Sequence, residues 1–197
     1  INLKFQDPPH SNLVFIIAAD LVNSYRHLQT SLERIAYASY VIEISDGLLA
    51  EREENQQVFD HLKGALMHLE DGQPSLRFLT SFELKLLRLV GYQPVLEACK
   101  KCRLDYLGSS GIQWRFSPIN GGLLCENCAR MHKEAMPLST AAIEVMLALQ
   151  VENTLPTQFS LPVSVVGEIR GAILGFIQYH VDREIKSASF LSTFSSG

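Results

Sequence analysis

The sequence predicts a mainly α-helical protein, a helical bundle with a small four-cysteine module inserted between its helices. Two observations indicate this: apolar residues recur at helical spacing along most of the chain, and all four cysteines lie between residues 99 and 128. With 197 residues, the chain can bury a hydrophobic core without disulfide bonds. We therefore place a helical domain over residues 20–197, with the module inserted at 97–133.

Two short apolar stretches precede the helices, at residues 3–5 and 13–18. The sequence Asp7-Pro8-Pro9 separates them, and this composition predicts two strands joined by a turn. Two strands alone do not make a stable domain. Ile1 is not a start residue, so we expect residues 1–19 either to pair with missing N-terminal sequence or to lie against the helices.

Three helices are expected next. The first follows Asp20 as its N-cap and ends at the Asp46-Gly47 pair, and the second covers residues 51–69. The third covers residues 75–90 and ends at Gly91, because glycine readily adopts the left-handed conformation that closes a helix. This third helix is too apolar for a half-exposed surface helix, which predicts a place at the centre of the bundle. Its apolar residues are Leu76, Leu79, Phe82, Leu86, Leu87 and Leu89.

The pattern changes inside the module. Residues 108–111 form a Gly-Ser-Ser-Gly turn, and Ile112, Trp114 and Phe116 then alternate with polar residues as in a strand. Helical spacing returns in two segments, and the tail is expected to add a short helix. These segments are residues 139–149, 163–181 and 185–194.

Several function classes lack support. No stretch approaches the roughly 20 continuous apolar residues needed to cross a bilayer, and no signal-peptide pattern opens the chain, so we expect a cytoplasmic protein without a membrane partner. The sequence also lacks a glycine-rich phosphate loop, a nucleophile elbow and paired acids at catalytic spacing. We therefore expect a protein that is not an enzyme.

The cysteines form two Cys-x-x-Cys pairs separated by 22 residues. Each pair places two sulfurs on one side of the backbone, and two pairs can complete a tetrahedron around zinc with Zn–S distances of about 2.3 Å. We therefore predict a structural zinc ion on Cys99, Cys102, Cys125 and Cys128. His132 is near enough in sequence to compete, but four thiolates already fill such a site, so we place it beside the ligands or in solvent.

Three other uses of the cysteines remain open: two disulfides, a redox-active pair, or an iron–sulfur cluster. A cytoplasmic location disfavours disulfides, and the polar loop around Cys99 does not supply the strand–helix context of a thioredoxin-like site. A closed four-sulfur site leaves no position for water or substrate. The ion is therefore expected to organise structure rather than to catalyse.

Charge is distributed unevenly, although the net charge is −4. Residues 43–71 carry eight acids and two bases, whereas residues 84–133 carry eight bases and three acids. Basic residues that cluster around the cysteines are candidates for phosphate contacts, and the alternative is that they only keep the module soluble. These candidates are Lys100, Lys101, Arg103, Arg115, Arg130 and Lys133.

Aromatic and helical surfaces give two further candidates. Trp114 and Phe116 could stack on the bases of a single strand, or could form the small core of the module. Lys85 and Arg88, with apolar neighbours on the third helix, could receive an acidic peptide tail with a hydrophobic end. Ordinary solvation of a helix surface is the alternative. Four histidines show no ligand spacing and are interpreted as structural: His27, His61, His68 and His180.

Three stretches of the sequence resemble the RecO family of bacterial DNA repair and recombination mediators. They are SFELKLLRLVGYQPVLEACKKC at residues 81–102, FSPINGGLLCENC at 116–128 and REIKSASFL at 183–191. The helix that ends in a Gly-Tyr-x-Pro run before the first cysteine pair, and the Phe-Ser-Pro-x-x-Gly-Gly run into the second, carry most of the likeness. It extends over roughly residues 13–191.

This resemblance implies an N-terminal OB-fold followed by a helical domain that carries the zinc module. Residues 1–19 would be the terminal strands of an incomplete OB-fold. It also implies a bacterial, nucleoid-associated protein that binds single- and double-stranded DNA and anneals complementary strands. Such proteins join RecR to help RecA displace single-stranded-DNA-binding protein, whose acidic C-terminal tail docks on the helical domain.

Two hypotheses compete with this one. A zinc-stabilised protein–protein adaptor would have no direct role at DNA, and a thiol redox enzyme would turn over disulfides and hold little metal. A salt-sensitive affinity for DNA would separate the mediator from both, because phosphate contacts release counterions.

Overall fold

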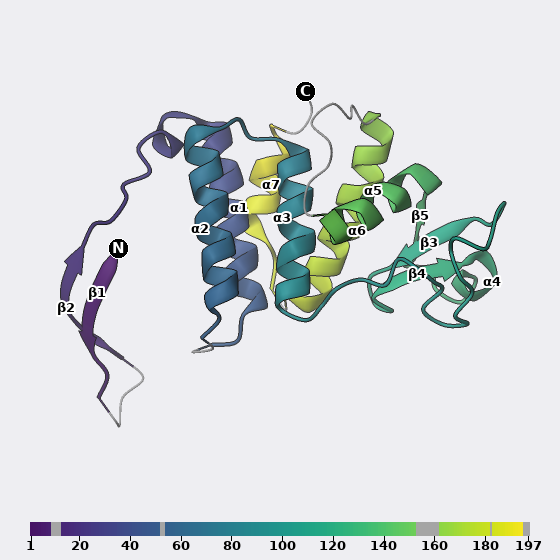
Figure 1. Cartoon of the computed structure of the whole chain (residues 1–197), viewed down its shortest axis with the longest axis horizontal. Coiled ribbons are helices and arrows are strands. Elements are labelled where there is room, and N and C mark those ends of the chain that lie inside the picture. Colours follow the sequence, from purple (N-terminus) through teal and green to yellow (C-terminus); the bar gives the residue numbers. More distant parts are fainter. Residues whose placement is uncertain (9–12, 52–53, 153–161, 182, 195–197) are drawn as a thin grey trace.

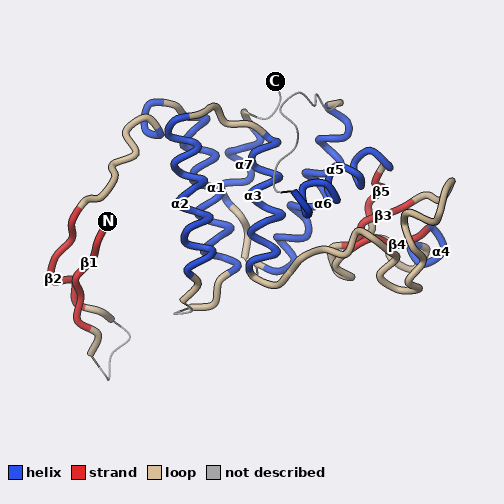
Figure 2. The backbone as a smooth tube through the Cα atoms, viewed as in Figure 1, coloured by secondary structure: helices blue, strands red, loops and turns tan. Residues whose placement is uncertain are grey.

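A two-stranded hairpin, a bundle of helices and a small three-stranded module follow one another in space (Figure 1). This computed structural model describes residues 1–8, 13–51, 54–152, 162–181 and 183–194. The mainly helical fold expected from the sequence is confirmed, and the helices are drawn in blue in Figure 2. No helix in the described ranges combines the length and the apolar character needed to span a bilayer.

The hairpin consists of β1 (Asn2–Gln6) and β2 (Phe15–Asp20), which pair antiparallel with Asn2 opposite Asp20. The two predicted strands are therefore confirmed, while Pro9 of the predicted turn lies outside the described residues. Every residue of both strands is exposed, so the hairpin is not buried against the helices.

The first helix, α1 (Leu32–Leu48), begins eleven residues later than the sequence predicted. Asp20 does not cap it, because Asp20 pairs in β2. The Ser31 side chain caps the helix instead, accepting a hydrogen bond from the backbone nitrogen of Arg34 at 3.4 Å. Gly47 does not stop it either, since the helix continues to Leu48.

A separate short turn, η1 (Leu28–Thr30), precedes this helix. The carboxylate of Glu70 accepts hydrogen bonds from the backbone nitrogens of His27 at 3.0 Å and Leu28 at 2.9 Å. These donors are therefore engaged by a residue more than forty positions away, which explains why helical spacing alone misplaced the start of α1.

The next two helices have clear local end signals. In α2 (Gln56–Asp71) the Asn55 side chain accepts from the backbone nitrogen of Val58 at 3.0 Å, so the predicted start at residue 51 was wrong. In α3 (Leu76–Leu89) the Ser75 side chain caps the backbone nitrogen of Phe78 at 3.2 Å. Gly91 follows α3 with φ +81°, as predicted for a closing glycine.

The helix α3 lies at the centre of the bundle, which confirms the expectation from its apolar sequence. It packs against α1, α2, α5 (Thr140–Glu152) and α6 (Val163–His180). The last helix, α7 (Lys186–Ser192), packs on α1. Most of α3 is therefore buried on several sides rather than along a single stripe.

The module contains a three-stranded antiparallel sheet in the order β4-β3-β5. Its strands are β3 (Trp114–Ser117), β4 (Gly122–Cys125) and β5 (Met136–Leu138), with the short helix α4 (Glu126–Ala129) after β4. The sequence predicted only the central strand. Trp114 is 4% exposed and Phe116 is 0% exposed, so both form the core of the module rather than a surface for stacking.

Candidate metal centre

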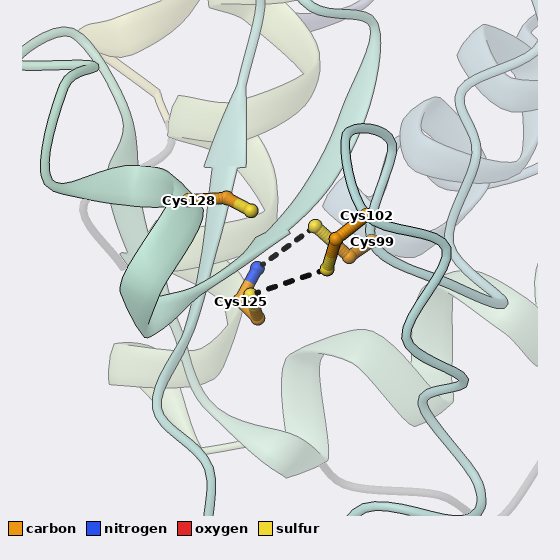
Figure 3. Close-up of side chains that lie close together, drawn as sticks. All are labelled: Cys99, Cys102, Cys125 and Cys128. Carbon is orange, nitrogen blue, oxygen red and sulfur yellow. Dashed lines mark hydrogen bonds between the residues drawn. The ribbon is translucent and has the colours of Figure 1, made fainter.

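The four cysteine sulfurs converge on one point in the module (Figure 3). All four ligand atoms lie within 4.8 Å of one another, and the Sγ atoms of Cys102 and Cys125 are 3.7 Å apart. Sulfurs at the corners of a tetrahedron with Zn–S distances of about 2.3 Å would be about 3.8 Å apart. The cluster therefore suits a single tetrahedral metal ion.

The first Cys-x-x-Cys pair lies on a tight turn. The backbone nitrogen of Arg103 donates to the oxygen of Cys99 at 2.9 Å, and the nitrogen of Cys99 donates to the oxygen of Leu104 at 2.8 Å. Arg103 has φ +64°, an uncommon conformation for a residue with a side chain, and it turns the chain back after Cys102. This turn directs both sulfurs toward β4.

The second pair is placed by the end of β4 and the start of α4. Cys125 is the last residue of β4, and Cys128 lies one turn later in α4. The backbone nitrogen of Lys100 donates to the oxygen of Leu123 at 2.7 Å, which ties the first turn directly to β4. The two pairs are therefore held together by backbone contacts as well as by any ion.

Gly122 allows the segment before the first pair to approach β4. The backbone nitrogen of Leu123, which follows Gly122 in β4, donates a hydrogen bond to the oxygen of Val95 at 2.9 Å. A Cβ atom on Gly122 would lie only 2.3 Å from that oxygen, and Gly122 has φ +158°. Only glycine fits here without moving the backbone that leads into Cys99.

The thiols cannot all ionise together without a cation. Burial acts to raise the pKa of Cys99, but backbone N–H donors from Cys102, Cys125 and Lys101 outweigh it and lower that pKa to about 6. Burial and the neighbouring sulfurs raise the pKa of Cys128 to about 12. One thiolate therefore forms easily and opposes ionisation of the next, so a bound cation would be needed to stabilise four thiolates.

His132 belongs to a separate polar network. Its Nδ1 atom lies 3.1 Å from Asn120 Nδ2 and 3.2 Å from Glu134 Oε1, and the Ser117 hydroxyl donates to the same Glu134 oxygen at 2.9 Å. Among the described residues, the group of ligand atoms suited to a metal consists of the four cysteines, without His132. This agrees with the expectation that His132 is not a ligand.

The basic residues predicted to contact phosphates differ in exposure. Five side chains are exposed: Lys100, Lys101, Arg103, Arg130 and Lys133. The sixth, Arg115, is half-buried, and its Nε atom donates to the backbone oxygen of Ala135 at 2.9 Å. Arg115 therefore has a structural contact that the other five do not show.

A groove between α2 and α3 encloses a cavity of about 570 Å³. Lys85 lines it, while Arg88 is exposed outside it, so the structure separates the two residues that the sequence had grouped. Two histidines of α2 that we interpreted as structural stack on phenylalanines of α3 here, His61 on Phe82 at 4.5 Å and His68 on Phe78 at 4.4 Å. These ring contacts could not be predicted from the sequence, because the phenylalanines lie on a different helix from the histidines.

Comparison with known proteins decides the family. The model for "Recombination protein O C terminal" matches residues 29–189, which include α1, α3 and the whole module. The chain belongs to the RecO family. The resemblance seen in the three sequence stretches is thus confirmed, and RecO proteins are non-enzymatic DNA repair proteins, in agreement with the sequence.

Individual RecO proteins resemble the chain over nearly all its length. The chain is 35% identical over 184 residues to "DNA repair protein RecO" of Symbiobacterium thermophilum, covering 90% of this chain and 70% of that protein. It is 31% identical over 190 residues to the RecO protein of Roseiflexus sp., covering 91% of this chain and 63% of that protein. The chain is 31% identical over 187 residues to the RecO protein of Anaeromyxobacter sp. strain Fw109-5, covering 94% of this chain and 72% of that protein. The chain thus spans roughly two thirds of its relatives' length.

Proposed function

We propose that this chain is a DNA repair and recombination mediator that binds DNA and anneals complementary strands. One observation carries the proposal: in a chain of the RecO family, five exposed basic side chains each lie within five residues of a cysteine of the four-cysteine cluster. Such side chains neutralise phosphates and leave the hydrogen-bonding edges of the bases free to pair with a second strand.

The ion held by the cysteines is zinc in this proposal. A tetrahedral set of four thiolates is the usual donor set for structural zinc, and it leaves no open position for a substrate. When bound, the ion supplies cross-linking of the turn at Cys99 and Cys102 to the end of β4. The chain's own residues then present Lys100, Lys101 and Arg103 on a fixed turn next to the ligands.

The partners follow from family membership and from the groove. We propose that the chain joins RecR to help RecA displace single-stranded-DNA-binding protein. The acidic, hydrophobic-ended tail of that protein would dock in the α2–α3 groove, where Phe78 and Leu89 offer apolar surface and Lys85 offers a positive charge. Residues 1–19 would be the terminal strands of an OB-fold, which the exposed apolar side chains of β1 and β2 support.

A salt titration tests the DNA proposal. Affinity for a fluorescent single-stranded oligonucleotide should fall steeply with salt, and Lys101→Gln should reduce the slope of log K against log salt by about 0.7, the value for one phosphate contact on a single strand. Lys63→Gln on α2 is the matched control, since it removes an exposed charge from the acidic part of the chain. The same slope for both variants would contradict phosphate contact by the module.

The alternative function is a zinc-stabilised adaptor without direct DNA binding, and the α2–α3 groove is the observation that favours it. An adaptor would bind an acidic peptide in the groove but would show no salt-sensitive affinity for DNA. The two titrations, one with oligonucleotide and one with peptide, therefore separate the candidates.

A further inference from the structure

An aromatic cluster lies where α3 and α6 meet at their C-terminal ends, which touch in the lower part of the bundle in Figure 1. Tyr92, in the loop after α3, stacks on His180 at the end of α6 with ring centroids 4.0 Å apart and an interplanar angle of 19°. Tyr179 meets the same imidazole edge-on at 5.3 Å. Tyr92 is 41% exposed and Tyr179 is 53% exposed, so both tyrosine rings reach solvent.

The cluster is anchored to the protein core. Phe176 contacts His180 at 4.7 Å and also contacts Phe116 of β3 at 5.8 Å, which links the tyrosines through α6 to the module. The backbone nitrogen of Tyr92 donates to the oxygen of Leu87 at 2.8 Å, which fixes the loop on the end of α3. The exposed rings are thus held on rigid supports and lose little freedom when something stacks on them.

The surroundings of the rings favour nucleic acid over a protein partner. Exposed residues next to them in the chain are polar or basic: Gln93 beside Tyr92, Gln178 beside Tyr179, and Arg88 one turn before Tyr92. Exposed rings with a neighbouring cation are typical of surfaces on which the bases of single strands stack. Tyrosine and arginine are also enriched in protein interfaces, and membership of a DNA repair family favours nucleic acid over a protein partner.

We propose that Tyr92 and Tyr179 form a stacking platform for the bases of single-stranded DNA. This rests on the proposed DNA binding and deepens it, because it assigns the bases to a different surface from the phosphates. The basic turn at Lys100 and Lys101 contacts the backbone, and the tyrosine platform contacts the bases. The tyrosines take the stacking role that the sequence suggested for Trp114 and Phe116, which are buried and cannot contact bases.

The test compares Tyr92→Ala and Tyr179→Ala with Phe59→Ala, which truncates an exposed aromatic residue on α2. Each tyrosine variant should weaken binding of a single-stranded oligonucleotide about fivefold or more, while Phe59→Ala should not. The salt slope should stay at the wild-type value in both tyrosine variants, because stacking releases no counterions. Unchanged affinity, or a reduced slope, would overturn the platform.

A fluorescent variant tests the same contact without truncating the ring. The chain has one tryptophan, the buried Trp114, so a Tyr92→Trp variant adds a single exposed fluorophore. Its added emission should be quenched by single-stranded DNA and should not be quenched by the same concentration of duplex. Quenching that is absent, or equal for both, would overturn the platform even if an alanine variant failed to fold. If the wild-type chain bound no DNA, the proposed DNA binding would fail as well.

Discussion

The carboxylate of Glu83 on α3 forms an ion pair with the guanidinium of Arg170 on α6 inside the helical bundle. Glu83 is 0% exposed, and the Tyr40 hydroxyl on α1 donates to its Oε1 atom at 2.6 Å. Burial and the Glu83 charge raise the pKa of Tyr40 well above its ordinary value, which keeps this hydroxyl protonated as a donor. One buried acid therefore links three helices.

Removing one partner of this pair should be costly. Glu83→Ala leaves the largely buried Arg170 without its counter-charge and should lower the free energy of unfolding by about 3–5 kcal/mol, measured by urea denaturation. The double variant Glu83→Leu/Arg170→Met should be more stable than Glu83→Ala, because no buried charge is left unpaired. A double variant whose loss of unfolding free energy equals the sum of the losses in the Glu83 and Arg170 single variants would contradict this account.

Loss of the metal should act mainly on the module. Cys99→Ser or Cys125→Ser is expected to abolish stoichiometric zinc, detected by elemental analysis of the purified protein. Amide hydrogen exchange should then rise in β3, β4 and β5, while α1 and α3 keep most of their protection. Ser110→Ala, at an exposed position of the same module, is the control and should retain the metal. Reduced protein that is metal-free and equally protected would rule out a structural ion.

Two glycine substitutions should have opposite effects. Gly122→Ala places a Cβ atom 2.3 Å from the Val95 oxygen, so it should weaken zinc retention in competition with a chelator. Gly167→Ala on α6 meets no atom within 4 Å and should stabilise the protein by about 0.5–1 kcal/mol through helix propensity. Equal retention of zinc in both variants would show that the close contact between Val95 and Gly122 is not needed for metal binding.

The N-terminus of α7 depends on Glu43 of α1. Its carboxylate accepts from the backbone nitrogens of Lys186 at 3.0 Å and Ser187 at 2.8 Å. Burial acts to raise the pKa of Glu43, but the Ser187 and Lys186 donors outweigh it and lower that pKa. The carboxylate therefore stabilises the folded state above the ordinary value of 4.5, and this contribution is lost as pH falls through the lowered pKa.

Glu43→Ala should accordingly lower the free energy of unfolding by about 1.5 kcal/mol at pH 7. The difference between wild type and variant should shrink in urea titrations below pH 4.5. A difference that is constant from pH 7 to the acid limit would exclude the ionised cap as its cause.

The position of Lys85 in the groove makes a prediction about peptide binding. Lys85→Glu should weaken binding of an acidic peptide with a hydrophobic C-terminal end at least tenfold, measured by fluorescence anisotropy. Arg88→Glu introduces the same charge change one turn away, outside the groove, and should have a smaller effect. Equal effects of the two variants would indicate general charge attraction rather than docking between α2 and α3.

Local signals in the sequence were sufficient for some elements. The ends of α3 were predicted because Ser75 and Gly91 act on their immediate neighbours. The clustering of the four cysteines was predicted because each Cys-x-x-Cys pair is local and the sequence contains no other cysteine. Family motifs added the rest of the identification.

Features that depend on distant partners were missed. The start of α1 was misplaced because Asp20 pairs with Asn2 and Glu70 engages the segment at His27. Strands β4 and β5 are only four and three residues long, and they form through pairing with β3 rather than through their own composition. The ion pair between Glu83 and Arg170 was not predicted, because its two residues lie 87 positions apart in the sequence.

The separation of 87 positions between Glu83 and Arg170 in the sequence also sets an order for folding during synthesis. At translation rates of about 5–20 residues per second, Glu83 is synthesised roughly 4–17 s before its counter-charge Arg170. All four cysteines have been synthesised by residue 128, so the module could bind the proposed zinc ion during that interval. The nascent chain would then hold a folded zinc module before α6, which completes the helical bundle, has been synthesised.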